Sequence, residues 1–163
     1  MTWTVAPESP DSPMAKALWR AYYTEVSDRY YLLHKGHPTD PSELSRELAN
    51  PPTTELTLPG GQLLVARYEG EPAGSVGIRL QNPNTAELTR VFVDPRMRGK
   101  GGGKLLVLSA EATARTLHAT RMILDTRHDL TEARALYTAL GYEETPPHND
   151  GVYAEHWFTK PLD

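Results

Sequence analysis

The chain has 163 residues and a mass of 18.1 kDa, enough for one domain with a buried core. Hydrophobic residues make up 39 %, charged residues 23 %, and mean hydropathy is −0.52, so the composition is that of an ordinary soluble domain. The absence of cysteine excludes disulfides and a covalent cysteine intermediate, and it fits a cytoplasmic protein. No apolar run approaches the roughly 18 residues of a membrane span, and no signal peptide is visible, so no membrane association is expected.

The predicted elements alternate between helices and strands in a fixed order. They are a strand over 3–5, helices over 14–33 and 40–49, strands over 62–68, 74–80 and 87–93, a helix over 103–117, a strand over 122–125, a helix over 129–141, and strands over 142–145 and 152–159. Ser12 before Pro13, and the capping boxes that begin at Asp40 and Asp129, predict three helix starts, and Gly141 predicts a helix end.

This order predicts the fold class. The three central strands form antiparallel hairpins, and the strand–helix–strand unit that follows them forms a parallel crossover. We therefore expect an α/β (α+β) fold: a mixed, mostly antiparallel sheet of about six to seven strands flanked by four helices. With no linker long enough to divide the chain, residues 1–163 are expected to form a single domain.

Charge is unevenly distributed along the chain. The net charge of −4 argues against a nucleic-acid partner. Residues 96–104, RMRGKGGGK, nevertheless hold four basic residues and no acid. A short cationic segment on an acidic chain predicts a bound anion of limited size.

The glycines of this segment suggest which anion is bound. Each glycine costs a helix about 1 kcal/mol relative to alanine, so three in a row at a helix start need a reason. Backbone amides that wrap a phosphate at a helix N-terminus supply one; the alternative is a flexible, solvated basic loop. The P-loop pattern fails at Arg98 and Leu105, and the dinucleotide pattern fails at Lys104.

A third pattern does fit. Arg96-x-x-Gly99-x-Gly101, after the strand LTRVFV, resembles the acetyl-CoA signature [QR]-x-x-G-x-[GA] of the GNAT superfamily of N-acetyltransferases. Downstream, Ala133-x-x-Leu136-Tyr137-x-x-x-Gly141-Tyr142 is similar to a second motif of that family. The resemblance is sharp over about residues 86–145, and the order of elements extends it to nearly the whole chain.

The resemblance implies acetyl-CoA as the co-substrate, and it implies where the cofactor binds. The backbone of a strand would pair with the pantetheine arm, and the basic glycine segment would cradle the pyrophosphate. The implied residues are Val91, Phe92 and Val93 for pantetheine and Arg96, Arg98, Gly99, Lys100, Gly101, Gly102, Gly103 and Lys104 for pyrophosphate. Leu130 stands where the family frequently has an asparagine, so that side-chain hydrogen bond is not expected here.

Two residues are candidates for proton transfer. By resemblance, Tyr137 is the general acid that donates to the leaving thiolate; the alternative is a core tyrosine on an apolar helix face. Glu87 lies where some family members carry a glutamate base. Its alternative is a cross-strand ion pair with Arg79, opposite it in a hairpin. A chain of waters can also take the proton, and it needs no particular residue.

The acceptor site is the least defined part of the sequence. Tyr30 and Tyr31, next to the loop between the first two helices, are candidate substrate-binding residues, because the family's acceptor cleft usually involves that region. No metal is expected; a site built from His148, Asp150 and His156 is the weaker alternative.

These observations predict an N-acetyltransferase. It would move an acetyl group from acetyl-CoA to a primary amine of a small molecule or peptide, by direct attack in a ternary complex. The alternatives are a non-catalytic CoA-binding sensor or partner domain with the same fold, and a protein that binds another nucleotide. The acceptor is not identified, and a homodimer is left open because superfamily members are often dimers.

Overall fold

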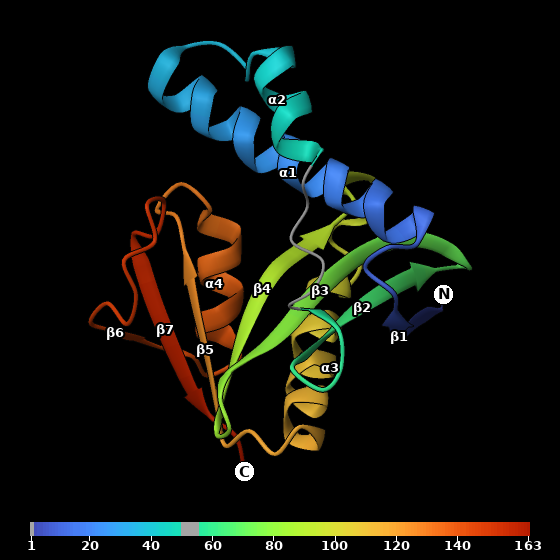
Figure 1. The fold of residues 1–163 in the computed structure, drawn as a ribbon, viewed down its shortest axis with the longest axis vertical. Helices are drawn as coiled ribbons and strands as arrows, with labels where there is room; N and C mark the ends of the chain where they lie inside the picture. The colour runs from blue at the N-terminus through green and yellow to red at the C-terminus, as the bar shows by residue number, and fades with distance from the viewer. Residues whose placement is uncertain (1, 50–55) are drawn as a thin grey trace.

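The computed structural model describes residues 2–49 and 56–163, which build one seven-stranded sheet in the order β1-β2-β3-β4-β5-β7-β6 (Figure 1). All neighbouring strands are antiparallel except β4 and β5. The strands are β1 (Trp3–Glu8), β2 (Gly61–Tyr68), β3 (Glu71–Asn82), β4 (Thr85–Val93), β5 (Arg121–Thr126), β6 (Glu143–Thr145) and β7 (His156–Pro161). The helices are α1 (Pro13–Lys35), α2 (Pro41–Leu48), α3 (Gly102–Thr116) and α4 (Thr131–Ala139), with a 3-10 turn, η2, at Pro95–Met97. The predicted fold class is confirmed.

Local capping chemistry explains two of the helix starts. The Ser12 hydroxyl accepts a hydrogen bond from the Ala15 amide at 3.0 Å and begins α1. The Asp40 carboxylate accepts from the amides of Ser42 and Glu43 and begins α2. Both starts were predicted, and both are confirmed.

Two predicted boundaries are wrong. The N-cap of α4 is Leu130, with no side-chain cap, because the carboxylate of Asp129 is bound to Arg127 instead. The last strand was predicted to begin at residue 152, but β7 begins at His156, and residues 152–155 belong to the irregular connection that precedes it.

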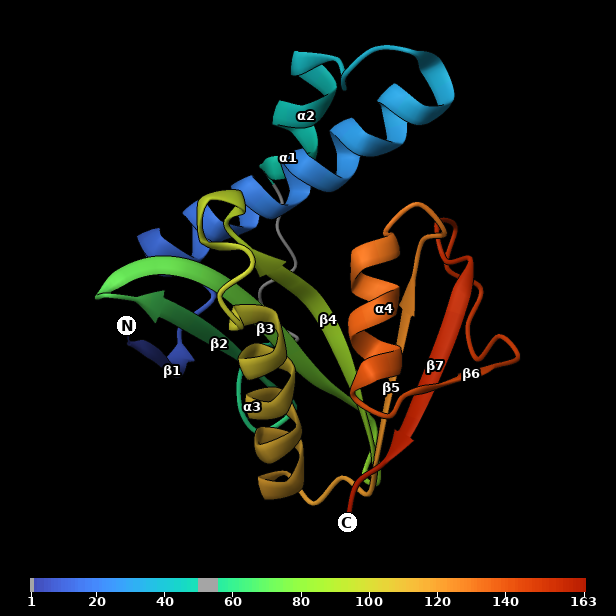
Figure 2. The same ribbon diagram turned by 180° about the vertical axis from the view of Figure 1, so that it is seen from behind.

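Two apolar clusters hold the layers together. Seen from behind, α3 and α4 lie over one face of the sheet, while α1 and α2 lie across its other side at one end (Figure 2). Ile78, Leu106 and Met122, all fully buried, join the sheet to α3. Leu18 of α1 packs with Val65 and Phe92 in a separate cluster, which anchors α1 to the centre of the sheet.

The separation of β4 from β5 positions the site. The two strands pair only through residues 85–87 and 121–123, and further along they diverge (Figure 1). The pairing of β4 with β3 is irregular, because two residues of β4, Arg90 and Val91, lie opposite the single residue Val76 of β3. Arg90 also has the unusual φ of 57°. The far half of β4 therefore has a backbone edge that β5 does not cover.

One buried carboxylate links the two halves of the sheet. Glu111 on α3 is 2 % exposed, and its oxygens accept from Lys160 Nζ on β7 at 3.0 Å. The Tyr142 hydroxyl donates to the same carboxylate at 2.9 Å. Because a buried charge is costly without partners, these contacts fix α3 against β7.

Candidate active site

A cleft of about 860 Å³ lies where β4 and β5 diverge. One of its ends is lined by residues 98–99 and 101–104, and the other by α1, α2 and residues 151–154 of the loop before β7. The ends of β4 and β5 and one side of α4 lie between them. All the predicted site residues line this cleft except Arg96 and Lys100.

Residues 99–103, which we call the glycine arc, form the first end of the cleft. Gly99 and Gly101 have φ values of 79° and 87°, a left-handed conformation that side chains disfavour. Gly101 is the N-cap of α3 and makes no side-chain capping bond, so the amides of the first helical turn have no partner within the helix. With Lys104 exposed in that turn, the arc fits an anion such as a phosphate.

The arc is held in place from behind by β1. The Trp3 indole donates to the carbonyl of Lys100 at 2.9 Å. A Cβ at Gly102 would lie only 2.4 Å from the Trp3 ring, so this position is closed to any other residue unless the ring moves. Glycine is therefore needed at three positions of the arc for two reasons. Gly99 and Gly101 need a left-handed conformation, and Gly102 needs space for the Trp3 ring.

Arg96 and Lys100 point elsewhere. The Arg96 guanidinium binds Asp94 through contacts of 2.9 and 3.1 Å, and 78 % of its side chain is exposed. Lys100 Nζ lies 5.5 Å from the centre of the Tyr68 ring. Neither side chain faces the cleft, so in this structure the amides of the arc and Lys104 are the groups presented to an anion.

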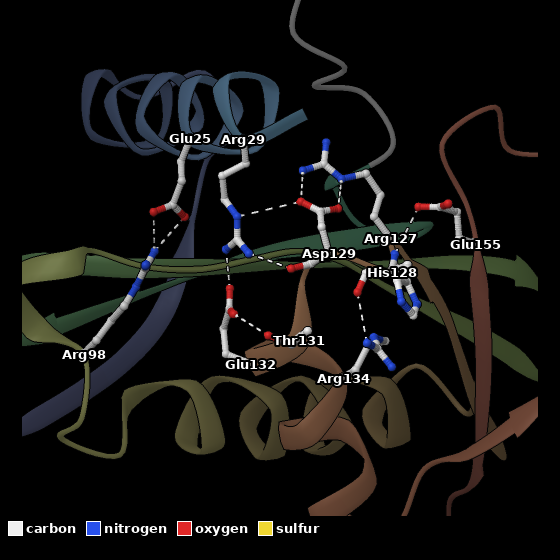
Figure 3. Close-up of polar contacts among 10 residues, drawn as sticks. All are labelled: Glu25, Arg29, Arg98, Arg127, His128, Asp129, Thr131, Glu132, Arg134 and Glu155. Carbon is white, nitrogen blue, oxygen red and sulfur yellow. Dashed lines mark hydrogen bonds and ion pairs between the residues drawn. The ribbon is translucent and has the colours of Figure 1, made fainter. Parts of the chain in front are cut away.

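Arg98 lines the cleft, but its guanidinium is already bound. Nη2 donates to both oxygens of Glu25 on α1, at 2.7 and 2.9 Å (Figure 3). Nε donates to the carbonyl of Val93 at 2.8 Å. The residue predicted as a phosphate ligand thus joins the end of β4 to α1.

The three residues predicted to face the pantetheine arm divide between two surfaces. The Phe92 side chain is buried under α1, whereas Val91 and Val93 pack against the main core on the other face. All three also line the cleft. Their strand edge, which β5 leaves uncovered, is available to an extended ligand.

Tyr137 combines burial with access to the cleft. It is 6 % exposed, and its ring contacts Tyr142 and Phe158 in the core. Burial raises the pKa of the Tyr137 phenol well above its ordinary value of 10, and the nearby Tyr22 and Asp125 raise it further. Tyr137 also lines the cleft. Tyr137 is therefore a protonated donor at neutral pH.

Glu87 shows the predicted ion pair and also lines the cleft. It lies opposite Arg79 in the β3–β4 register, and Arg79 Nε donates to its carboxylate at 2.5 Å. Gln81 Nε2 donates to the same oxygen at 2.8 Å. The cross-strand pair is confirmed, and the carboxylate is 6 % exposed at the point where the strands separate.

Tyrosines gather at the end of the cleft opposite the glycine arc. Tyr30 packs against Tyr31, with ring centres 5.7 Å apart, and against Tyr153 of the loop before β7, at 5.1 Å. Tyr31 donates to Glu43 on α2 at 2.6 Å, and this hydrogen bond raises the pKa of Tyr31 to about 12. Tyr30 and Tyr31 both line the cleft, as predicted.

The sequence analysis missed several cleft residues. Asp125, the next-to-last residue of β5, accepts a hydrogen bond from Asn149 Nδ2 at 2.8 Å, and Arg127 lies 5.5 Å from the centre of the Tyr30 ring. Arg29 reaches the same region from α1. No local motif marks these residues, because the fold brings them together from distant parts of the chain.

Histidine contacts differ from those considered for a metal. His156 contacts His128 at 2.9 Å and Glu144 at 2.8 Å. In residues 2–49 and 56–163 no group of three or more histidine or acidic side chains has a metal-binding arrangement. Over the same ranges, no helix has the length and apolar character needed to span a membrane.

The fold occurs in known proteins. A solved structure from Klebsiella pneumoniae is 25 % identical, with a TM-score of 0.72 over 99 % of both chains. The Schizosaccharomyces pombe protein named uncharacterized N-acetyltransferase C1271.07c is 34 % identical over 72 % of this chain and 73 % of its own. The Escherichia coli protein named uncharacterized N-acetyltransferase YjgM is 38 % identical over 59 % of this chain, and the match spans only 62 % of that relative's length.

These likenesses define the class as acetyltransferase. A family model described as the acetyltransferase (GNAT) family matches residues 14–142, most of the chain. The chain belongs to the GNAT acetyltransferase family.

Proposed function

We propose that the chain transfers the acetyl group of acetyl-CoA directly to an amine held at the acceptor end of the cleft. The observation that carries the proposal is the opening of the glycine arc, the uncovered edge of β4 and the Tyr137 phenol onto one cleft. An Elizabethkingia anophelis GNAT acetyltransferase with acetyl-CoA bound supports it, because that structure shares the fold with a TM-score of 0.63 at 17 % identity.

The cofactor contacts are assigned to the glycine arc and the edge of β4. The first-turn amides of α3 and Lys104 would bind the pyrophosphate, since they combine unpaired donors with positive charge. The edge of β4 at Val91–Val93 would pair with the pantetheine arm, and its amides would polarise the thioester carbonyl.

Proton transfer falls to the residues between the two ends. Tyr137 would donate to the thiolate as it leaves, since its phenol is protonated at neutral pH and faces the cleft. Glu87 is the proposed base for the amine, and Asp125 is one of the other carboxylates that line the cleft. Tyr30 and Tyr31 would contact the acceptor.

The acceptor amine is proposed only as a class. Relatives act on different amines by name: the human N-acetylaspartate synthetase is 32 % identical over 80 % of this chain, and the Stenotrophomonas maltophilia aminoglycoside N(6')-acetyltransferase type 1 is 29 % identical over 60 %. One fold accommodates both, so the acceptor must be identified by experiment.

Thermal unfolding with acetyl-CoA, ATP or NAD tests the cofactor first. A ligand at 100 times its Kd adds about 2.7 kcal/mol, which should raise the Tm by roughly 5–10 °C. A shift with acetyl-CoA alone supports the assignment, and no shift contradicts it. A panel of amines with thiol-release detection then tests turnover. Binding without release of thiol across a broad panel would favour the non-catalytic alternative.

A further inference from the structure

The two walls of the cleft belong to different parts of the sheet. One wall is the end of β4 with the glycine arc, and the other is the end of β5 with α4, which carries Tyr137. Backbone pairing between β4 and β5 stops at residues 87 and 123. Beyond that point no ladder hydrogen bond fixes the distance between the walls.

Helix α1 crosses this gap and is bound to both walls (Figures 1 and 3). Glu25 and Arg29 are one helical turn apart, so they project from the same face of α1. Glu25 receives Arg98 Nη2 at 2.7 and 2.9 Å, and Arg98 also holds the Val93 carbonyl at 2.8 Å. This end of the contact is fixed to β4.

The other end is fixed to the segment between β5 and α4. Arg29 Nη1 donates to the Glu132 carboxylate, and Nη2 donates to the carbonyl of Asp129 at 2.6 Å. The Asp129 carboxylate is in turn held by Arg127 at 2.9 and 3.0 Å. Positive and negative groups therefore alternate across the cleft from Arg98 to Arg127.

Connectivity, more than burial, distinguishes these contacts from isolated surface ion pairs. The Arg127 and Asp129 side chains are 11 % and 17 % exposed, whereas the exposed fractions of Glu25, Arg29, Arg98 and Glu132 are 28 %, 33 %, 40 % and 59 %. Exposed single pairs contribute little, whereas connected pairs with several hydrogen bonds contribute more. Each pair here is also attached to a backbone carbonyl of the wall it contacts, Val93 or Asp129.

We propose that α1 is a crossbar that fixes the width of the cofactor cleft, with Glu25, Arg98 and Arg29 as its positioning residues. Arg98 acts by holding the end of β4 to α1 and not as a pyrophosphate ligand. The part of this inference that concerns CoA rests on the proposed function; the part that concerns cleft width does not.

The ligand test compares the Kd of CoA, by titration calorimetry, among Glu25→Gln, Arg98→Gln, Arg29→Gln and the Glu25→Gln/Arg29→Gln double variant. Each single variant should weaken binding about three- to tenfold. The double variant should bind CoA with the same Kd as the weaker-binding of its two single variants. Loss of either contact already detaches α1 from one wall, so loss of the second contact adds nothing. Arg20→Gln, an exposed arginine on the same helix, is the matched control and should bind as the wild type does.

Three results would overturn the proposal. Weakening by Arg98→Gln alone, with Glu25→Gln unchanged or tighter, would make Arg98 a phosphate ligand. Additive losses in the double variant would make the two contacts independent. Unchanged binding in every variant would reduce them to surface ion pairs.

A distance measurement tests the crossbar without any ligand. Because the chain has no cysteine, Leu108→Cys on α3 and Ala135→Cys on α4, both exposed, can carry two spin labels. Glu25→Gln and Arg29→Gln should lengthen or broaden the label-to-label distance distribution, and Arg20→Gln should leave it unchanged. Superimposable distributions in all variants would refute the crossbar, whereas failure of the wild type to bind CoA would refute only the proposed function.

Discussion

At one end of the cleft, the groups that face a ligand are mainly backbone amides from one continuous segment, residues 99–103. At the other end, they are side chains from α1, α2, β4, β5 and the loop before β7. The first arrangement depends on local conformation, because Gly99 and Gly101 need left-handed φ values. The second depends on tertiary packing, because Tyr30 and Tyr153 meet only in the folded chain. Enzymes that share a cofactor but differ in their acceptor would need this division: a cofactor end set by local conformation and an acceptor end set by tertiary packing.

Tyr137, between the two ends, should give the largest effect. Tyr137→Phe removes the proton donor and keeps the ring contacts with Tyr142 and Phe158, so kcat should fall about 10²- to 10⁴-fold while the Kd of CoA stays unchanged. Because burial raises the pKa of the phenol, wild-type kcat should show no loss through tyrosine ionisation up to pH 10. Thiol release measured against pH checks both, and activity within threefold of wild type would exclude Tyr137 as the acid.

Matched substitutions of two cleft carboxylates, Glu87 on β4 and Asp125 on β5, separate the proposed base from a second acid of the cleft. Glu87→Gln should lower kcat/KM at neutral pH about tenfold or more, since the amine loses its proton acceptor, and activity should recover as pH rises and the free amine becomes available. Asp125→Asn is the matched substitution and should lower kcat/KM less. A larger loss in Asp125→Asn than in Glu87→Gln would transfer the role to Asp125.

The glycine arc should respond to a single added carbon. Gly102→Ala places a Cβ against the Trp3 ring, and overpacking of this kind costs about 1–3 kcal/mol. We expect a Tm lowered by several degrees and weaker CoA binding. Gly60→Ala, where a Cβ meets nothing within 4 Å, should change neither. A Gly102→Ala protein with wild-type Tm and CoA affinity would show that the ring moves without cost.

The smallest predicted effect concerns the acceptor end and its pH dependence. Burial alone would raise the pKa of Glu132, but the hydrogen bond from Arg29 holds it below its ordinary value of 4.5. The stability this carboxylate adds is therefore complete well above pH 4.5 and is lost as pH falls through its pKa in the folded state. Glu132→Gln should lower the Tm at pH 7 and have a smaller effect near pH 3. An equal difference at both pH values would contradict this.

Local signals predicted much of the fold and the cofactor end. Ser12 and Asp40 cap their helices as expected, since capping depends on neighbouring residues. The Glu87–Arg79 pair could be read from the turn that joins β3 and β4. The glycines of residues 99–103 predicted a ligand-binding segment, and in the structure these glycines line the cleft.

Distant contacts explain what the sequence did not reveal. Asp129 was predicted as a helix cap, but Arg127 and Arg29 bind it instead. Arg98 was predicted as a phosphate ligand from its neighbours, yet its partner Glu25 lies 73 positions earlier in the chain. In both cases a tertiary contact overrode a local preference. Asp125 and Tyr153 carry no motif, so only the folded chain shows that they line the cleft.

The place of β7 between β5 and β6 has a consequence for the order of folding. β5 and β6 do not pair with each other; each pairs with residues 156–161. During synthesis, β4, α3 and β5 emerge early and can assemble, but the outer edge of β5 stays open until β7 arrives. Lys160, the partner of buried Glu111, arrives with it. The core beneath the glycine arc is therefore completed last, by the last strand in chain order.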